Sequence, residues 1–168
     1  MKEHLAYISV GSNLGDKLIN CQKGIATLTS GEKVNLVEIS RFYITQPVDF
    51  KEQEWFVNAV IKITTSFDPF KLLAEMLSIQ QRAGRHADKI RFGPRILDLD
   101  ILFYDNLVIK ESNLVLPHPR MHKRRFVLKP ICDIDKNLNH PILKKNMQVL
   151  LDSLQDNEQK VLECSCEP

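Results

Sequence analysis

The sequence predicts an α+β fold of the ferredoxin-like βαββαβ type, in which helices cover one face of an antiparallel sheet and leave the other free for ligands. One observation is the length of 168 residues, the size of a single domain. Another is that no internal repeat or Gly/Ser-rich linker divides residues 1–168. The third is the order in which strand-like and helix-like patterns follow one another. A C-terminal extension with a short polar tail completes the predicted domain.

The first half of the chain contains three expected strands and one helix. Residues 5–10 form an apolar run typical of a buried strand, and the turn-rich residues 11–15 end it. Residues 34–43 alternate loosely between apolar and polar side chains, and residues 55–65 form a longer strand. Between the first two strands lies a helix whose core face is predicted to consist of Leu18, Cys21, Ile25 and Leu28.

The second half adds a helix, a strand and a final short helix. Asp68 is a good N-cap with Pro69 at the first helical position, and Gly84 is a suitable stop. Residues 96–103 are predicted to form the fourth strand, and residues 147–154 the last helix. The spacing places Phe70, Leu73, Leu77 and Gln80 on one face of the helix. The core face of the strand is predicted to be Leu97, Leu99, Ile101 and Phe103.

The composition excludes several classes of protein. Hydrophobic residues make up 43% and charged residues 26% of the chain, which is typical of a globular protein and not of a disordered, collagen-like or coiled-coil chain. No apolar run approaches the roughly 20 residues of a membrane helix, and no signal peptide is recognisable. The four cysteines have no zinc-site spacing. We therefore expect a reduced, cytoplasmic protein without membrane partners. A monomer is a separate expectation, which the composition does not decide.

Two strongly basic windows stand out against a net charge of only +2. Residues 82–95 contain five Lys or Arg against one acid, and residues 120–129 contain five against none. A single window of this kind is explained equally well by a solvated charged face and by a binding site. Two windows flanking a pair of carboxylates favour a local site for a polyanion.

The pair of carboxylates is Asp98 and Asp100, in the predicted fourth strand. Side chains alternate along a strand, so both point to one face at a separation of about 7 Å. Such a pair suits a hard divalent cation, above all Mg²⁺, which commonly shares its remaining coordination positions with substrate phosphates. The alternative is two solvated acids on an exposed strand face; the neighbouring cations favour the metal.

Phosphate groups at such a site would be neutralised by nearby cations, for which Arg85, Arg91, Arg95, His118 and Arg124 are candidates. No Walker A sequence, kinase Gly-rich loop or G-x-G-x-x-G is present. A nucleotide would therefore be held by side chains and metal rather than by a glycine-rich loop.

Aromatic and amide side chains form a further candidate set. Phe56 and Asn58 share a strand face, and Phe126 follows the second basic window. Two aromatic rings and an amide suit a flat heterocycle that is stacked and hydrogen-bonded at its edge. From spacing alone, burial of both phenylalanines in the core is the simpler explanation.

Three motifs resemble one known family. Gly11-Ser12-Asn13 follows the first strand, residues 92–101 read Phe-Gly-Pro-Arg-Ile-Leu-Asp-Leu-Asp-Ile, and Leu116-Pro117-His118-Pro119 precedes Arg124 and Phe126. Their order and spacing resemble the 6-hydroxymethyl-7,8-dihydropterin pyrophosphokinases of folate biosynthesis. The resemblance runs from about residue 5 to residue 154, nearly the whole chain.

The resemblance implies the reaction and the roles of residues. Members transfer diphosphate from ATP to the hydroxymethyl group of the pterin, release AMP and use two Mg²⁺ ions; no nucleic acid takes part. Asp98 and Asp100 would hold the metals and, with Arg85 and Arg95, form the catalytic set. The implied ATP contacts are Arg85, Phe92, Arg95, Ile101, His118 and Arg124, and the implied pterin contacts are Thr45, Val48, Phe56, Asn58 and Phe126.

The chain also departs from the family pattern. Gln80 stands where many members have Glu, Ala87 where many have a second Arg, and Pro119 where some have Tyr. None is expected to touch the metal pair or the pterin pocket, so we expect altered nucleotide affinity rather than lost activity. Two rival functions remain: a module that binds single-stranded RNA on the same fold, and a metal-dependent nuclease.

Overall fold

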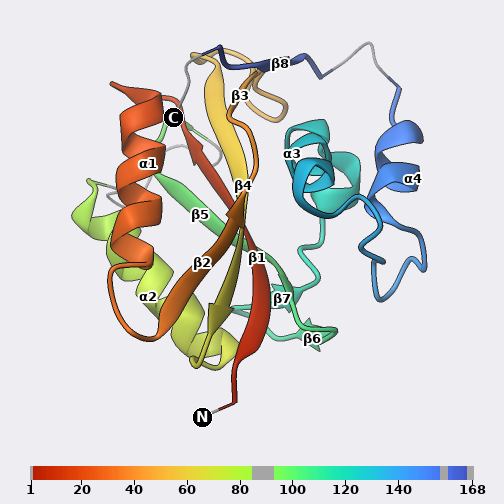
Figure 1. Ribbon diagram of the computed structural model, residues 1–168. Coiled ribbons are helices and arrows are strands. Elements are labelled where there is room, and N and C mark those ends of the chain that lie inside the picture. The colour runs from red at the N-terminus through yellow and green to blue at the C-terminus, as the bar shows by residue number, and fades with distance from the viewer. Residues whose placement is uncertain (1, 85–92, 156–158, 166–168) are drawn as a thin grey trace.

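The computed structural model describes residues 2–84, 93–155 and 159–165, and an antiparallel sheet is its central layer (Figure 1). Within this part of the chain the sheet has six strands, in the order β5-β1-β4-β3-β8, with β2 also paired to β4. The predicted strand over residues 5–10 is β1 (His4–Ser12), which lies between β4 (Phe56–Thr65) and β5 (Asp98–Tyr104). The predicted α+β class with an antiparallel sheet is confirmed.

The predicted strand over residues 34–43 is two strands. β2 (Val34–Ile39) and β3 (Tyr43–Thr45) both pair with the long strand β4, one after the other along its edge. The chain bends between them at Ser40, whose N–H donates to the Val60 carbonyl and whose Oγ accepts from the Val60 N–H, both at 2.9 Å. A side-chain hydroxyl thus takes a place in the ladder, which the pattern of apolar residues does not reveal.

The expected polar tail contributes a strand to the sheet. β8 (Val161–Glu163) pairs antiparallel with β3 and forms one edge of the sheet. Partly buried Cys164 packs against the main core, and its N–H donates to the Phe42 carbonyl at 2.8 Å. A separate two-stranded sheet consists of β6 (Ile109–Lys110) and β7 (Val115–Leu116).

Helices α1 (Lys17–Leu28) and α2 (Pro69–Arg82) cover one face of the sheet, as predicted (Figure 1). Asp68 caps α2 as expected, accepting from the N–H groups of Phe70 and Lys71. Gly84 then has φ of +103°, the left-handed conformation that commonly ends a helix. On α1, the expected core residues Cys21, Ile25 and Leu28 are buried, and Leu18 packs against them.

The face of α2 that the sequence analysis singled out is only partly buried: Leu73 packs against the core and Gln80 is buried, but the other two residues are not. Phe70 and Leu77 are 41% and 46% exposed, whereas Leu72, Met76 and Ile79 are buried. Both stripes have helical spacing, so periodicity cannot choose between them. The contact of α2 with β5 decides which stripe is buried.

The second face of the sheet is only partly free, which corrects the expectation of an open face. α3 (Arg125–Asp135) packs on it beside a short 3-10 helix (Met121–Lys123), with α4 (Met147–Asp152) outside α3 (Figure 1). Phe103 also faces this second core, not the first, because an irregular register between β1 and β5 leaves Leu102 unpaired with β1 and interrupts the alternation. The second core contains Tyr7, Val60, Leu102, Phe103, Met121, Val127, Leu128, Ile131, Met147, Leu150 and Leu151.

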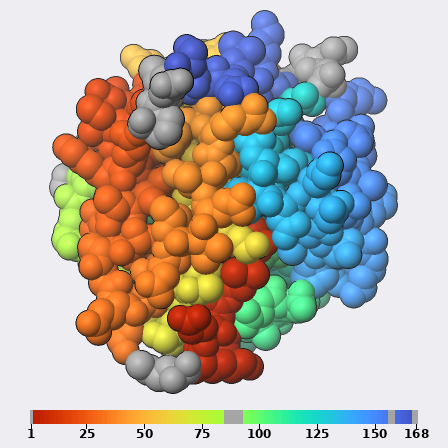
Figure 2. All heavy atoms as spheres, in the orientation of Figure 1, coloured from red at the N-terminus to blue at the C-terminus, as the bar shows by residue number. Residues whose placement is uncertain are grey.

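The orange surface in Figure 2 includes β2, whose Leu36, Val37 and Ile39 are 43%, 52% and 40% exposed. Cyan and blue atoms of α3 and α4 lie to its right in this view. Among the described residues, no helix combines the length and apolar composition needed to cross a membrane.

Candidate active site

The antiparallel register brings the predicted site residues together at one end of the sheet. Gly11 on the central strand β1 lies opposite Asn58 of β4 on one side and opposite Asp98 of β5 on the other. Neighbouring strands are about 4.8 Å apart, so the backbones of Asn58 and Asp98 are roughly 10 Å apart across the sheet. The predicted pterin and metal groups therefore lie at two ends of one site.

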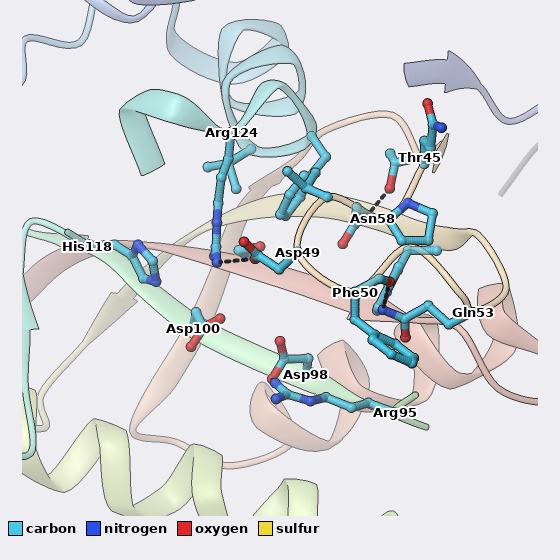
Figure 3. A pocket seen from close by; sticks show the side chains of 18 of the residues that line it. Thr45, Asp49, Phe50, Gln53, Asn58, Arg95, Asp98, Asp100, His118 and Arg124 are labelled. Carbon is cyan, nitrogen blue, oxygen red and sulfur yellow. Dashed lines mark hydrogen bonds and ion pairs between the residues drawn. The ribbon is translucent and has the colours of Figure 1, made fainter. Parts of the chain in front are cut away.

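A pocket opens at this position (Figure 3). Its floor is the face of the sheet that α3 leaves uncovered, and the loop of residues 46–55 forms one wall. Thr45 and Asn58 lie at one end of the close-up, and His118, Asp100 and Arg124 at the other. The predicted residues that line it are Thr45, Val48, Phe56, Asn58, Arg95, Asp98, Asp100, His118, Arg124 and Phe126.

Asp98 and Asp100 point from β5 into the pocket, as the alternation predicts. Both are partly exposed, and the buried Leu99 between them faces the core beneath α1 and α2. Arg95 donates from Nη1 to Asp98 Oδ1 at 3.0 Å. In the described part of the chain no cluster of three or more metal-ligating side chains occurs. Two carboxylates in an accessible pocket fit a Mg²⁺ ion that completes its coordination with substrate phosphates and water.

Cations face this pair from the segment before α3. The Arg124 side chain is 13% exposed, and burial followed by the charge of Arg120 lowers its pKa, although a guanidinium stays protonated. Burial, with the positive charges of Arg124 and Arg120, lowers the pKa of His118 to about 4. His118 is therefore neutral at pH 7. Its Nδ1 accepts from the Arg120 N–H at 3.2 Å, which leaves the ring proton on Nε2 as a donor.

Asp49, which the sequence analysis did not single out, lies beside these cations (Figure 3). Its Oδ2 is 3.5 Å from Arg124 Nη2 and 3.9 Å from Arg120 Nη1. The carboxylate belongs to the loop that also forms the wall of the pterin end. The Asp49 carboxylate thus lies next to arginines, one of which, Arg124, is expected to bind phosphate.

The other end of the pocket is neutral and polar. Asn58 is 5% exposed and donates from Nδ2 to Thr45 Oγ1 at 2.6 Å. Gly11 makes room for this amide, since a Cβ at Gly11 would lie 2.5 Å from Asn58 Oδ1. The amide is therefore held between the Thr45 hydroxyl and the backbone of Gly11.

Phe56 and Phe126 both line the pocket and are partly buried, so neither is simply a core residue. The Arg124 guanidinium carbon lies 5.4 Å from the centroid of the Phe126 ring. This cation–π contact connects the aromatic end of the pocket with the cationic end.

Asn13 is a connecting residue whose role the sequence analysis missed. It is fully buried; its Oδ1 accepts from the Arg95 N–H at 2.7 Å, and its own N–H donates to the Arg95 carbonyl at 3.0 Å. Its Nδ2 donates to Gln53 Oε1 at 2.9 Å and to the Glu54 carbonyl at 3.1 Å. Asn13 therefore joins the loop at the pterin end to the backbone of Arg95. The one sequence feature that could have indicated this role is that Asn13 belongs to the Gly11-Ser12-Asn13 motif.

Three predicted ATP contacts are not among the residues that are seen to line the pocket. The Ile101 side chain is 4% exposed and lies in the core on the opposite face of the sheet. Arg85 and Phe92 fall outside the described residues, as does the departure at Ala87.

Comparison with known proteins identifies the family. Residues 7–136 match the model of the 7,8-dihydro-6-hydroxymethylpterin-pyrophosphokinase (HPPK) family. The chain belongs to the HPPK family. The Bacillus subtilis 2-amino-4-hydroxy-6-hydroxymethyldihydropteridine pyrophosphokinase is 39% identical to this HPPK chain over 131 residues, 78% of each protein.

Other relatives of this HPPK chain are longer proteins. It is 37% identical to the folic acid synthesis protein fol1 of Schizosaccharomyces pombe over 91% of its own length, but spans only 21% of that protein. Plasmodium falciparum HPPK-DHPS, solved with pterin and p-hydroxybenzoate, superposes with a TM-score of 0.72 at 15% identity. The match covers 90% of this chain and 42% of that one, and supports the fold alone.

Proposed function

We propose that this chain transfers diphosphate from ATP to the hydroxymethyl group of 6-hydroxymethyl-7,8-dihydropterin, releasing AMP, in folate biosynthesis. One observation carries the proposal: in a member of the HPPK family, a single pocket joins a carboxylate pair with cations to a neutral amide and two aromatic rings. The first end suits a metal-bound polyphosphate, and the second suits a flat heterocycle with a polar edge.

The pterin would bind at the neutral end. Its ring can stack on Phe56 and Phe126, and the Asn58 amide can both donate to and accept from the mixed edge of the ring. Thr45 orients that amide through the 2.6 Å hydrogen bond, and Val48 lines the wall beside it. A ring in this position would direct its hydroxymethyl group along the pocket toward the carboxylates.

ATP would bind at the charged end. Asp98 and Asp100 would hold Mg²⁺, which when bound supplies charge neutralisation and alignment for phosphoryl transfer. Arg95 and Arg124 contribute fixed positive charge on either side of the carboxylates, and neutral His118 offers a donor from Nε2. The proposal retains contacts of ATP with Arg85 and Phe92 on the family resemblance alone, and leaves out the side chain of Ile101, which lies in the core.

The chemical step exchanges one P–O bond for another. The pterin hydroxyl oxygen forms a bond to the β-phosphorus of ATP while the bond from that phosphorus to the α,β-bridging oxygen breaks. The electron pair leaves with AMP, and the hydroxyl proton passes to solvent. Arg95 and Arg124 stabilise negative charge on the transferred group, because their charges are held in a partly buried site.

Further parts of the proposal are structural. Four strands pair in the order β5-β1-β4-β2, with α1 and α2 on one face, and this order supports a ferredoxin-like topology. We propose that residues 1–168 form a single domain. The number of metal ions is proposed as two from the family resemblance. For this chain we propose a monomer in the cytoplasm. The proposal does not extend to its fungal relatives, of whose length the chain spans about a fifth.

Product analysis tests the proposal. Purified protein is incubated with limiting ATP, Mg²⁺ and the pterin, and the nucleotides are separated by chromatography. We expect AMP and the pterin diphosphate in equal amounts. ADP as the stoichiometric product, or hydrolysis of RNA under the same conditions, would refute the pyrophosphokinase function in favour of a simple kinase or a nuclease.

A further inference from the structure

Gln80 lies beneath the carboxylate strand, on the side of the sheet away from the pocket. It is near the end of α2, and its side chain is 1% exposed. Leu99 N donates to Gln80 Oε1 at 3.2 Å, and Gln80 Nε2 lies 3.4 Å from the Leu99 carbonyl oxygen. The same Nε2 donates to the Met76 carbonyl at 3.1 Å. The departure from the family pattern at this position thus contacts the backbone of Leu99, between Asp98 and Asp100, without lining the pocket.

The contact lies at the edge of the sheet. β5 is the last strand of its sheet, with β1 as its neighbour. The backbone groups of alternate residues on an edge strand point away from the sheet and need another partner. At Leu99 that partner is the primary amide of Gln80, which has the same donor and acceptor pair as a peptide group. One side chain therefore takes the place of a neighbouring strand at a single residue.

We propose that Gln80 is a positioning residue for Asp98 and Asp100, because its amide holds the segment of β5 from which both carboxylates project. The inference rests on the proposed role of these carboxylates in holding the metal–nucleotide complex. Two carboxylates that share one cation must keep a fixed separation, and this separation depends on the backbone at Leu99. An edge strand without a partner there has more freedom to twist.

The neutral amide matches the backbone groups that it contacts in this chain. The amide accepts from one N–H group and donates to two carbonyl oxygens. An ionised carboxylate could still accept from Leu99 but has no proton to donate, and it would place negative charge beside both carbonyl oxygens in a buried position. A methionine of similar length would remove every one of these hydrogen bonds while filling the space.

The experiment compares Gln80→Met and Gln80→Glu with Gln81→Glu, a matched control at the exposed neighbouring position. Hydrogen exchange at the Leu99 amide is measured in the protein without ligands. Binding of a non-hydrolysable ATP analogue is titrated against Mg²⁺, and binding of the pterin is measured separately. Urea unfolding shows what fraction of each variant is folded.

We expect both Gln80 variants to exchange the Leu99 amide at least about tenfold faster and to need several-fold more Mg²⁺ for half-maximal analogue binding. Pterin affinity and the Gln81→Glu control should stay near wild type. Faster exchange with an unchanged Mg²⁺ requirement would overturn the positioning role, as would unchanged exchange or failure of both Gln80 variants to fold. A wild-type protein that binds the analogue but makes no AMP would refute the proposed function instead, and leave these comparisons valid.

Discussion

Replacing Gly11 with alanine should weaken pterin binding and leave nucleotide binding intact. The added Cβ would lie 2.5 Å from Asn58 Oδ1, well inside van der Waals contact, and 3.9 Å from Phe56 Cδ1. Gly11 is in the middle strand of the sheet, paired on both sides, so its backbone cannot easily move away. The Asn58 amide must therefore rotate or shift.

The expected magnitude follows from the hydrogen bond to the pterin that a displaced Asn58 amide would lose, because the bond to Thr45 is what orients this amide. Asn58 Nδ2 donates to Thr45 Oγ1 at 2.6 Å, and both residues are buried, at 5% and 1% exposure. Losing a buried hydrogen-bond partner costs about 1–3 kcal/mol. At about 1.4 kcal/mol per factor of ten, pterin affinity should fall roughly 5- to 140-fold.

The assay is calorimetric titration of Gly11→Ala with the pterin and, separately, with an ATP analogue and Mg²⁺. Gly31→Ala is the matched control, because a Cβ at Gly31 would have no neighbouring atom within 4 Å. Gly31→Ala should bind both ligands like wild type. The reasoning is refuted if folded Gly11→Ala binds the pterin normally, or if its affinity for the ATP analogue falls by the same factor.

Four further outcomes are expected. Asp98→Asn and Asp100→Asn should each lower kcat at least about 100-fold in steady-state assays, since a metal site supplies several kcal/mol of charge stabilisation; near-normal turnover would contradict the metal assignment. Asn58→Ala should weaken pterin binding about tenfold with little change in analogue binding, measured by the same titrations. Asp49→Asn should tighten ATP-analogue binding by up to about fivefold, because it removes an exposed anion 3.5 Å from Arg124; weaker binding would contradict this. Burial lowers the pKa of His118 to about 4, so the neutral ring stabilises the fold above pH 6.5 and this contribution is lost as the pH falls toward 4; in urea unfolding, His118→Asn should lose less stability over that range.

The position of Gln80 illustrates what sequence patterns leave open. Its helical spacing with Phe70, Leu73 and Leu77 suggests one apolar stripe, yet the buried stripe is Leu72, Met76 and Ile79. Gln80 is buried for a different reason, since its amide completes the edge of β5. Periodicity measures the spacing of side chains and contains no information on which backbone groups lack a partner.

The metal pair was predictable because its geometry is local. Asp98 and Asp100 share a face by the alternation of one strand, and neighbouring cations in the sequence indicate a polyanion. The same alternation failed three residues later at Phe103, where an irregular register between β1 and β5 turns the side chain to the other face. Such an irregularity arises from pairing with a distant strand, so it has no local signature.

By itself, then, the sequence determined the α+β class, the helix caps at Asp68 and Gly84, the shared face of the carboxylates and, through its motifs, the family. Only the tertiary structure decided that Asn13 joins Arg95 to the pterin loop, that Asp49 lies beside Arg124, and that α3 covers part of the second sheet face. Local features follow from the periodicity and chemistry of neighbouring residues. Contacts between residues tens of positions apart depend on the register of the strands and on the packing that this register permits.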